Sequence, residues 1–328
     1  MGQDKKTINA LLKYMRDIKG ISINGSKEKK QLMNIGYFHG YKGYRFVCDP
    51  KQQLKYNNFA ELMAVYEFDM HLKSILYPYI MSIETAFKSH AIETCIELCS
   101  DDFVEIYDKL LNKYTKYNAD SKDYKYSLKL KHKIRNIVYT SISERYNRES
   151  QEDRNKMITH YQHQGKPVPI WALFEILTLG QFGIFVETMD DNTSIRLAEN
   201  LKLYYSNTDQ NGRLIETMVY FLTDLRNAVA HNSVVFDCRF MKSNPPKMIK
   251  RFVKEETGIE AEFKSFDDFI ALIVGLLLKL EYSKTEVKRL IRSYVDNTEK
   301  LRAKVPIEIY NKILGTETKK KMSILLKL

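Results

Sequence analysis

The sequence is poor in the residues that interrupt helices. Its 328 residues include 13 glycines and 7 prolines. No long stretch alternates apolar and polar residues as a half-buried strand would. Lysine, glutamate, leucine and isoleucine are plentiful instead, which favours helices. The apolar share of 44% is sufficient for a buried core, so the sequence predicts an all-α protein.

Cysteine and long apolar runs are also scarce. Cys95 and Cys99 are spaced for one helix face, but no further cysteine or histidine stands at ligand spacing, which argues against a zinc site. We therefore expect no metal and no cofactor, and the four cysteines fit a reducing cytosol. The most apolar run, residues 269–278, is too short to cross a bilayer, and the N-terminus has no apolar signal core. The expectation is a cytoplasmic protein without a membrane partner.

Helical periodicity extends over most of the chain. Pro78 predicts a kink or a break in its longest pattern, since proline lacks an amide hydrogen. We expect one helical body, with a helical and aromatic segment at 1–58, a bundle at 59–240 and C-terminal helices at 241–328 packed on it. The expected helices cover residues 5–19, 27–35, 59–99, 170–183, 193–203, 212–231, 265–281, 284–300, 306–314 and 319–327, and two more are expected on either side of a loop at 118–123.

The net charge of +11 is concentrated in one region. Residues 109–135 hold nine lysines or arginines against two aspartates, with four tyrosines among them. Lysines can neutralise phosphates and tyrosines can stack on unpaired bases. A solvated helix face is the alternative interpretation. The candidate RNA-binding residues are Lys113, Lys116, Lys122, Lys125, Lys129, Lys131, Lys133, Arg135, Tyr124 and Tyr126.

The helix expected at 212–231 carries the pattern with the clearest chemistry. Its apolar residues form one stripe, and Asn227 and His231 fall roughly opposite that stripe. Because they are four apart, Asn227 can orient His231. Arg226 lies about 140° around the helix from His231. One helix does not bring those two head groups together, which favours a two-fold dimer with a composite site.

An arginine and a histidine suit RNA cleavage without a metal. The histidine can take the proton of a ribose 2′-hydroxyl, which then attacks the adjacent phosphorus. The arginine can stabilise the growing negative charge on the phosphoryl oxygens. A chance match to Arg-Asn-x3-His is expected in about one such sequence in fifty. Two alternatives stay open: an RNA-binding module in which Arg226 and His231 only bind phosphate, and a structural domain with a chance motif.

The stretch Arg226-Asn227-Ala228-Val229-Ala230-His231 resembles the Arg-Asn-x3-His motif of HEPN ribonucleases. The whole chain resembles abortive-infection (Abi) proteins of the AbiD/AbiF kind, which defend bacteria against phage. Matching segments follow the family order over most of residues 5–315. They are residues 35–37, 44–46, 66–69, 83–88, 169–175 with Gly180, and 225–231.

The resemblance implies a fold, a site and partners. It implies a HEPN-like helical bundle with additional N- and C-terminal helices, a homodimer, and an endoribonuclease site at Arg226, Asn227 and His231. It makes Glu84 a further catalytic candidate, since HEPN proteins often place a polar residue on a neighbouring helix facing the motif. Some relatives are paired with a noncoding RNA, which suits residues 109–135. The chain departs from the family directly after the histidine, so different substrate contacts are expected there.

Overall fold

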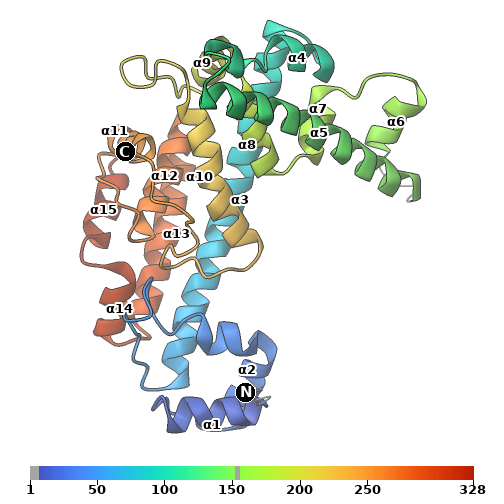
Figure 1. The fold of residues 1–328 in the computed structure, drawn as a ribbon. Coiled ribbons are helices and arrows are strands. Elements are labelled where there is room, and N and C mark those ends of the chain that lie inside the picture. The colour runs from blue at the N-terminus through green and yellow to red at the C-terminus, as the bar shows by residue number, and fades with distance from the viewer. Residues whose placement is uncertain (1–6, 152–155) are drawn as a thin grey trace. The chain divides into compact units, whose positions relative to one another are not determined.

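The computed structural model describes residues 7–151 and 156–328 and is built of helices (Figure 1). Over these two ranges no β-strand forms, and the few isolated β-bridges do not extend into a sheet. The predicted all-α fold is therefore confirmed. None of the helices in these ranges is long and apolar enough to span a membrane.

The chain divides into two compact units. The first unit comprises Met1–Tyr79, Asp224–Leu278 and Tyr282–Leu328, and the second comprises Ile80–Thr223 and Lys279–Glu281. Helices α3 (Phe59–Leu98) and α10 (Leu214–Ala230) contribute to both units. The three segments expected from the sequence, with boundaries at residues 58 and 240, do not coincide with these units and stay a prediction.

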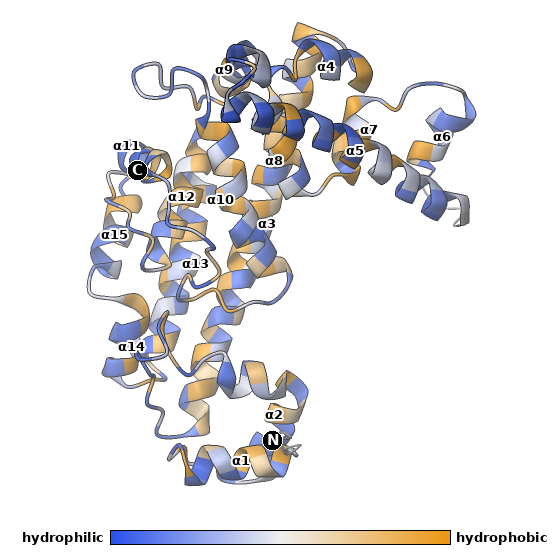
Figure 2. Ribbon diagram, in the orientation of Figure 1, coloured by the Kyte–Doolittle hydropathy of each residue, from blue (hydrophilic) through white to orange (hydrophobic). Residues whose placement is uncertain are grey.

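The remaining helices of the first unit lie in its N-terminal and C-terminal parts. They are α1 (Ile8–Asp17), α2 (Ser26–Tyr37), the π-helix η1 (Phe38–Lys42), α11 (Lys247–Thr257), α12 (Asp267–Lys279), α13 (Lys284–Arg302), α14 (Ile307–Leu314) and α15 (Thr318–Leu325). The core of this unit includes α12, whose residues 267–277 are all buried. The apolar run at 269–278 is thus a buried helix, and Figure 2 shows its hydrophobic character. Buried Asp267 accepts hydrogen bonds from Tyr294 (2.6 Å) and Thr318 (2.7 Å).

The second unit contains several shorter helices around the long α5. They are α4 (Phe103–Lys109), the 3-10 helix η2 (Lys113–Lys116), α5 (Lys122–Gln151), α6 (Met157–His163), α7 (Ile170–Ile176), α8 (Leu179–Thr188) and α9 (Asp191–Asn200). The single helix expected at 170–183 is wrong, because the chain breaks between α7 and α8. Leu177 is extended, and Thr178 caps α8 through a reciprocal pair of hydrogen bonds with Gln181. Trp171, on the first turn of α7, is 42% exposed.

Pro78 does not end α3. The helix runs from Phe59 to Leu98 with Pro78 inside it. A buried apolar stripe that continues past the proline, through Leu72, Leu76, Ile80 and Ile83, accounts for this. Tertiary packing of that stripe outweighs the one lost backbone hydrogen bond.

Candidate functional site

The C-terminal end of α10 carries the Arg-Asn-x3-His motif. The apolar stripe that includes Met218, Leu222 and Leu225 is buried, as its helical spacing predicts. Arg226 and Asn227 are half-buried, and His231 is exposed just after the last helical residue. The His231 amide still donates to the Asn227 carbonyl at 2.9 Å, so the histidine continues the helical turn. The motif therefore presents its histidine to solvent from an ordered helix end.

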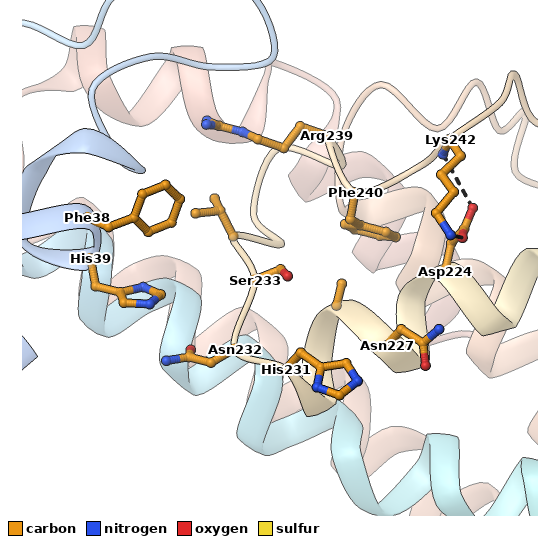
Figure 3. A pocket seen from close by; sticks show the side chains of 12 residues that line it. Phe38, His39, Asp224, Asn227, His231, Asn232, Ser233, Arg239, Phe240 and Lys242 are labelled. Atoms are coloured by element: carbon orange, nitrogen blue, oxygen red, sulfur yellow. Dashed lines mark hydrogen bonds and ion pairs between the residues drawn. The ribbon is translucent and has the colours of Figure 1, made fainter. Parts of the chain in front are cut away.

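Asn227 and His231 line one pocket of about 490 Å³, called here the His231 pocket (Figure 3). All of its lining residues belong to the first unit. They are Phe38, His39, Asp224, Asn227, Ala228, His231, Asn232, Ser233, Val234, Arg239, Phe240 and Lys242. Over the described residues, no hydrogen bond engages the imidazole of His231. Its nitrogens are therefore open to a ligand in the pocket.

Arg226 is placed differently from the other two motif residues. Its side chain is not part of the pocket lining. Its Nη1 donates to the Asn227 side-chain oxygen at 3.2 Å. The expected role of Asn227 in orienting His231 through their side chains stays a prediction. The structure instead shows the Asn227 amide oxygen bonded to the neighbouring arginine.

A buried carboxylate holds the loop that follows His231. Asp69 on α3 has a fully buried side chain. One of its oxygens accepts the backbone amides of Val235 and Phe236, both at 2.8 Å. The other accepts the Tyr44 hydroxyl at 2.7 Å and the Lys73 ammonium at 2.8 Å. Four donors satisfy this buried charge, as a buried carboxylate requires.

Lys73 extends the same network to the residue next to His231. Its ammonium donates to the Asn232 side-chain oxygen at 2.7 Å. Asn232 has a φ of 54°, a left-handed conformation that asparagine tolerates better than most residues. The backbone thus turns sharply after His231, and the amide bonded to Lys73 fixes that turn. Two steps of hydrogen bonding connect Asp69 to the position of the histidine.

A second link ties the loop to the N-terminal segment. The Arg239 guanidinium pairs with buried Asp237 and donates to the Phe46 carbonyl at 2.7 Å. Asp237 also accepts the Cys48 amide at 2.6 Å. The Gly43 backbone lies so close to the loop that a Cβ there would stand 3.1 Å from the Val234 side chain. The segment at 38–48 is therefore part of the site.

Four pocket residues with ionisable side chains were not predicted from the sequence: His39, Asp224, Arg239 and Lys242. Asp224 could have been found, because it stands three residues before Asn227 and seven before His231 on the same helix face. Its carboxylate lies 3.3 Å from the Lys242 ammonium (Figure 3). His39 comes from a distant segment, and Arg239 and Lys242 lie in the irregular loop after α10, where no helical spacing links them to the motif.

Glu84, the fourth catalytic candidate, lies on the part of α3 that belongs to the second unit. Its carboxylate pairs with the Lys88 ammonium at 3.0 Å, and both side chains are largely buried. Lys88 also donates to the Leu177 carbonyl at 2.8 Å, where α7 ends. This pair thus supports the break between α7 and α8. Its placement opposite the motif stays a prediction.

Some of the predicted RNA-binding residues are bonded within the second unit. Lys113 pairs with Glu216 (2.9 Å), and Lys116 pairs with Asp191 (2.7 Å). Lys131 is buried and donates to Asn112 at 2.6 Å. Burial lowers the pKa of Lys131. These three ammonium groups are the least free to meet a phosphate.

The tyrosines and the arginine of the predicted set have partial contacts. Tyr126 donates to Glu187 at 3.0 Å while most of its ring stays exposed. Tyr124 makes an edge contact with the Tyr114 ring at 5.5 Å. Arg135 is exposed beside the Tyr107 ring. The rings can therefore accept a stacked base only on the faces that these contacts leave open.

The other four predicted lysines form an exposed row on α5. Lys122, Lys125, Lys129 and Lys133 are all exposed and follow each other at helical spacing. Figure 2 shows the hydrophilic character of this helix. Lys129 and Lys133 also line a groove of about 470 Å³ along α5. We call these four residues the α5 basic row.

In the described residues, no group of three or more His, Cys, Asp or Glu side chains is arranged to hold a metal ion. No curated protein and no solved structure matches the chain. The Abi-like protein family matches residues 30–237, a range that contains the motif, the Asp69 network and the α5 basic row. Since the match spans more than half of the sequence, the chain belongs to the Abi-like protein family, whose general role is abortive infection as a defence against phage.

Proposed function

We propose that this chain is a HEPN endoribonuclease that cleaves RNA without a metal when phage infect the cell. The observation that carries the proposal is the intact Arg226-Asn227-x3-His231 motif, whose histidine is exposed in a pocket and held by a buried network. Family membership supports the defence role. The basic composition supports a polyanionic substrate.

His231 begins the reaction as a general base. Its imidazole takes the proton of a ribose 2′-hydroxyl, and the 2′-oxygen bonds to the adjacent phosphorus. The bond from phosphorus to the 5′-oxygen breaks, and that oxygen takes a proton from water, while the protonated imidazole of His231 returns its proton to solvent. The products carry a 2′,3′-cyclic phosphate and a 5′-hydroxyl. The Arg226 guanidinium stabilises the negative charge of the phosphoryl oxygens in the transition state.

The test is cleavage of RNA by purified protein in EDTA. His231→Ala and Arg226→Ala should each reduce the rate by about 10²–10⁴-fold. His160→Ala, at an exposed histidine of the second unit, is the matched control and should cleave normally. In a bacterial host, toxicity of the wild type should vanish with His231→Ala. Equal cleavage by wild type and His231→Ala would sink the proposal.

The active form is proposed to be a homodimer with composite sites. Asn227 and His231 line the pocket while Arg226 lies outside it, which supports an arginine supplied by the second copy. Mixing Arg226→Ala with His231→Ala subunits tests this. A composite site would be restored in mixed dimers, giving about one quarter of wild-type activity. Sites built within single chains would stay inactive in every mixture.

The α5 basic row favours a second candidate function. In this alternative the protein grips a structured noncoding RNA and cleaves nothing. It predicts tight, salt-sensitive binding without turnover in any condition. Loss of affinity on neutralising Lys125, Lys129 and Lys133, together with no cleavage by wild type, would favour it over the nuclease.

A further inference from the structure

The wall of the His231 pocket contributed by η1 presents an aromatic ring that the fold leaves uncovered. Phe38 is 51% exposed although it is large and apolar. It lines the pocket that also holds His231 (Figure 3). Proteins that bind single-stranded nucleic acids use aromatic side chains of this kind to stack on unpaired bases.

The backbone turn that carries Phe38 is closely packed. The residue begins η1, a single π-helical turn of a kind often found at functional sites. At Gly40, a Cβ would come within 2.3 Å of the Leu32 side chain, so this turn fits closely on α2. At Gly43, a Cβ would stand 3.2 Å from the Phe38 ring. The ring is thus presented in one place without a large entropy loss on binding.

His39 adds a polar group next to this ring. It lines the same pocket and meets the Phe38 ring edge-on, with centroids 5.2 Å apart. Among the described residues neither ring nitrogen has a hydrogen-bond partner, and Nδ1 is buried. Nε2 is therefore the nitrogen left for a ligand. Burial and the nearby Lys73 ammonium lower the pKa of His39, so the ring is neutral at neutral pH. A neutral imidazole can form a hydrogen bond with a polar group at the edge of a base.

The pocket also has a movable positive charge. Lys242 has an 80% exposed side chain, and its contact with Asp224 is 3.3 Å long. An exposed pair of this kind holds its partners weakly. The Lys242 ammonium can therefore move to a phosphate. The volume of about 490 Å³ falls within the range of pockets that enclose a small planar ligand.

We propose that Phe38 and His39 form a subsite for one unpaired nucleobase of a single-stranded RNA, next to the phosphate held at His231. The proposal rests on the proposed ribonuclease function for the identity of its ligand. Phe38 stacks on the base, and His39 Nε2 bonds to its polar edge. A base inside a duplex cannot reach this ring, because it is paired and stacked. The subsite thus restricts the substrate to loops and single strands.

The test measures binding of a 12-nucleotide 2′-O-methyl RNA, which cannot be cleaved at its 2′-oxygen, by fluorescence anisotropy with the full-length protein. Phe38→Leu removes the aromatic face and should weaken binding about 5- to 100-fold. Phe38→Trp keeps an aromatic face and should bind the RNA as tightly as wild type does. Tyr77→Leu is the matched control, because Tyr77 is a 49% exposed ring of the same unit outside the pocket. Equal affinities of wild type and Phe38→Leu would overturn the subsite.

A set of RNA strands that each lack one base, an abasic scan, identifies the position that occupies the subsite. Wild type should lose affinity when one particular position of the strand lacks its base, and Phe38→Leu should be insensitive there. With the base at that position varied, His39→Phe should lose any preference among the four bases. A flat scan, equal binding of the corresponding duplex, or no binding of a single strand by wild type would each overturn the proposal. So would equally strong competition by a free nucleoside monophosphate, which would indicate a small-molecule site.

The subsite and the nuclease can fail separately. Because the probe is not cleavable, coupling between Phe38 and one base can appear whether or not the protein cleaves RNA. Coupling without cleavage would reject the nuclease and keep the subsite. Cleavage without coupling would reject the subsite and keep the nuclease.

Discussion

The α5 basic row and the His231 pocket are both proposed to contact RNA, yet they are built in opposite ways. The lysines of the α5 basic row are exposed, and no hydrogen bond within residues 7–151 and 156–328 fixes their ammonium groups. The loop after His231 is held by a buried carboxylate with four donors. Attraction of a phosphate needs only charge, whereas proton transfer needs a nitrogen held within hydrogen-bond reach. The difference indicates that the α5 basic row contributes to affinity for RNA, whereas the network around Asp69 positions His231 for the chemical step.

The largest effect should follow removal of the buried carboxylate. Asp69→Ala leaves the buried Lys73 ammonium without its negatively charged partner and leaves two backbone amides without their acceptor. It should reduce the free energy of unfolding by about 3–5 kcal/mol, measured by chemical denaturation. Lys125→Ala, on the exposed face of α5, should change it by no more than about 0.5 kcal/mol. Similar losses for both variants would show that the two regions do not differ in this way.

The α5 basic row should act on affinity and leave the chemical step unchanged. Replacing Lys125, Lys129 and Lys133 by glutamine should weaken RNA binding about 10- to 100-fold. The slope of log affinity against log salt concentration should fall by about 2 for a single strand, since three phosphate contacts are lost. In cleavage assays KM should rise while kcat is kept. A fall in kcat at constant KM would contradict this assignment.

The turn after His231 should act on the chemical step and leave affinity unchanged. Asn232→Gly permits the left-handed backbone but removes the amide bonded to Lys73. We expect kcat to fall about tenfold, or about 1.4 kcal/mol, with KM unchanged. Lys202→Gly, at a φ of 58° in the second unit, is the control for the glycine itself. An unchanged kcat for Asn232→Gly would mean that the network holds the fold without positioning the histidine.

The smallest effect concerns the pH dependence of stability. The pKa of His39 is lowered in the folded protein by burial and by Lys73, with Asp69 acting in the opposite direction. Protons therefore bind the unfolded state more readily, so stability should fall as the pH drops below about 6.5. His39→Asn should reduce this dependence in denaturation midpoints measured at several pH values. His132→Asn, at an exposed histidine of α5, should leave it unchanged.

Much of the fold follows from local patterns in the sequence. The helices at 59–98 and 214–230 match their predicted stripes within a few residues, because burial of an apolar face repeats at helical spacing. Three helices, α4, α6 and α11, were not predicted. Two of them have only seven residues, and α11 begins directly after two prolines. The break at Leu177 was missed, since a capping Thr178 inside an apolar run resembles a continuing helix.

The site was predictable only along one helix. Asn227 and His231 share a pocket because they share a helix face, which the sequence shows directly. His39 and Lys73 reach the site only through tertiary contacts, such as the bond from Lys73 to Asn232, which spans 159 positions of the chain. The helical periodicity of the sequence gives no information about such contacts. The positive charge of a lysine did not predict whether its side chain is exposed to a ligand. Lys131 stands in the same basic pattern as Lys129, yet it is buried against tyrosine rings.

The Tyr44 hydroxyl donates a hydrogen bond to Asp69, the carboxylate that holds the loop after α10. The end of α10 therefore depends on the N-terminal part of the chain. Tyr44 is fully buried and stacks on Phe236, so it fills space as well as donating a hydrogen bond to Asp69. A fragment that begins at α3 would keep every motif residue but would expose this carboxylate and its loop to water. Transplanting Arg-Asn-x3-His onto another helix would meet the same obstacle. The smallest portable form of this site therefore has to start before Tyr44.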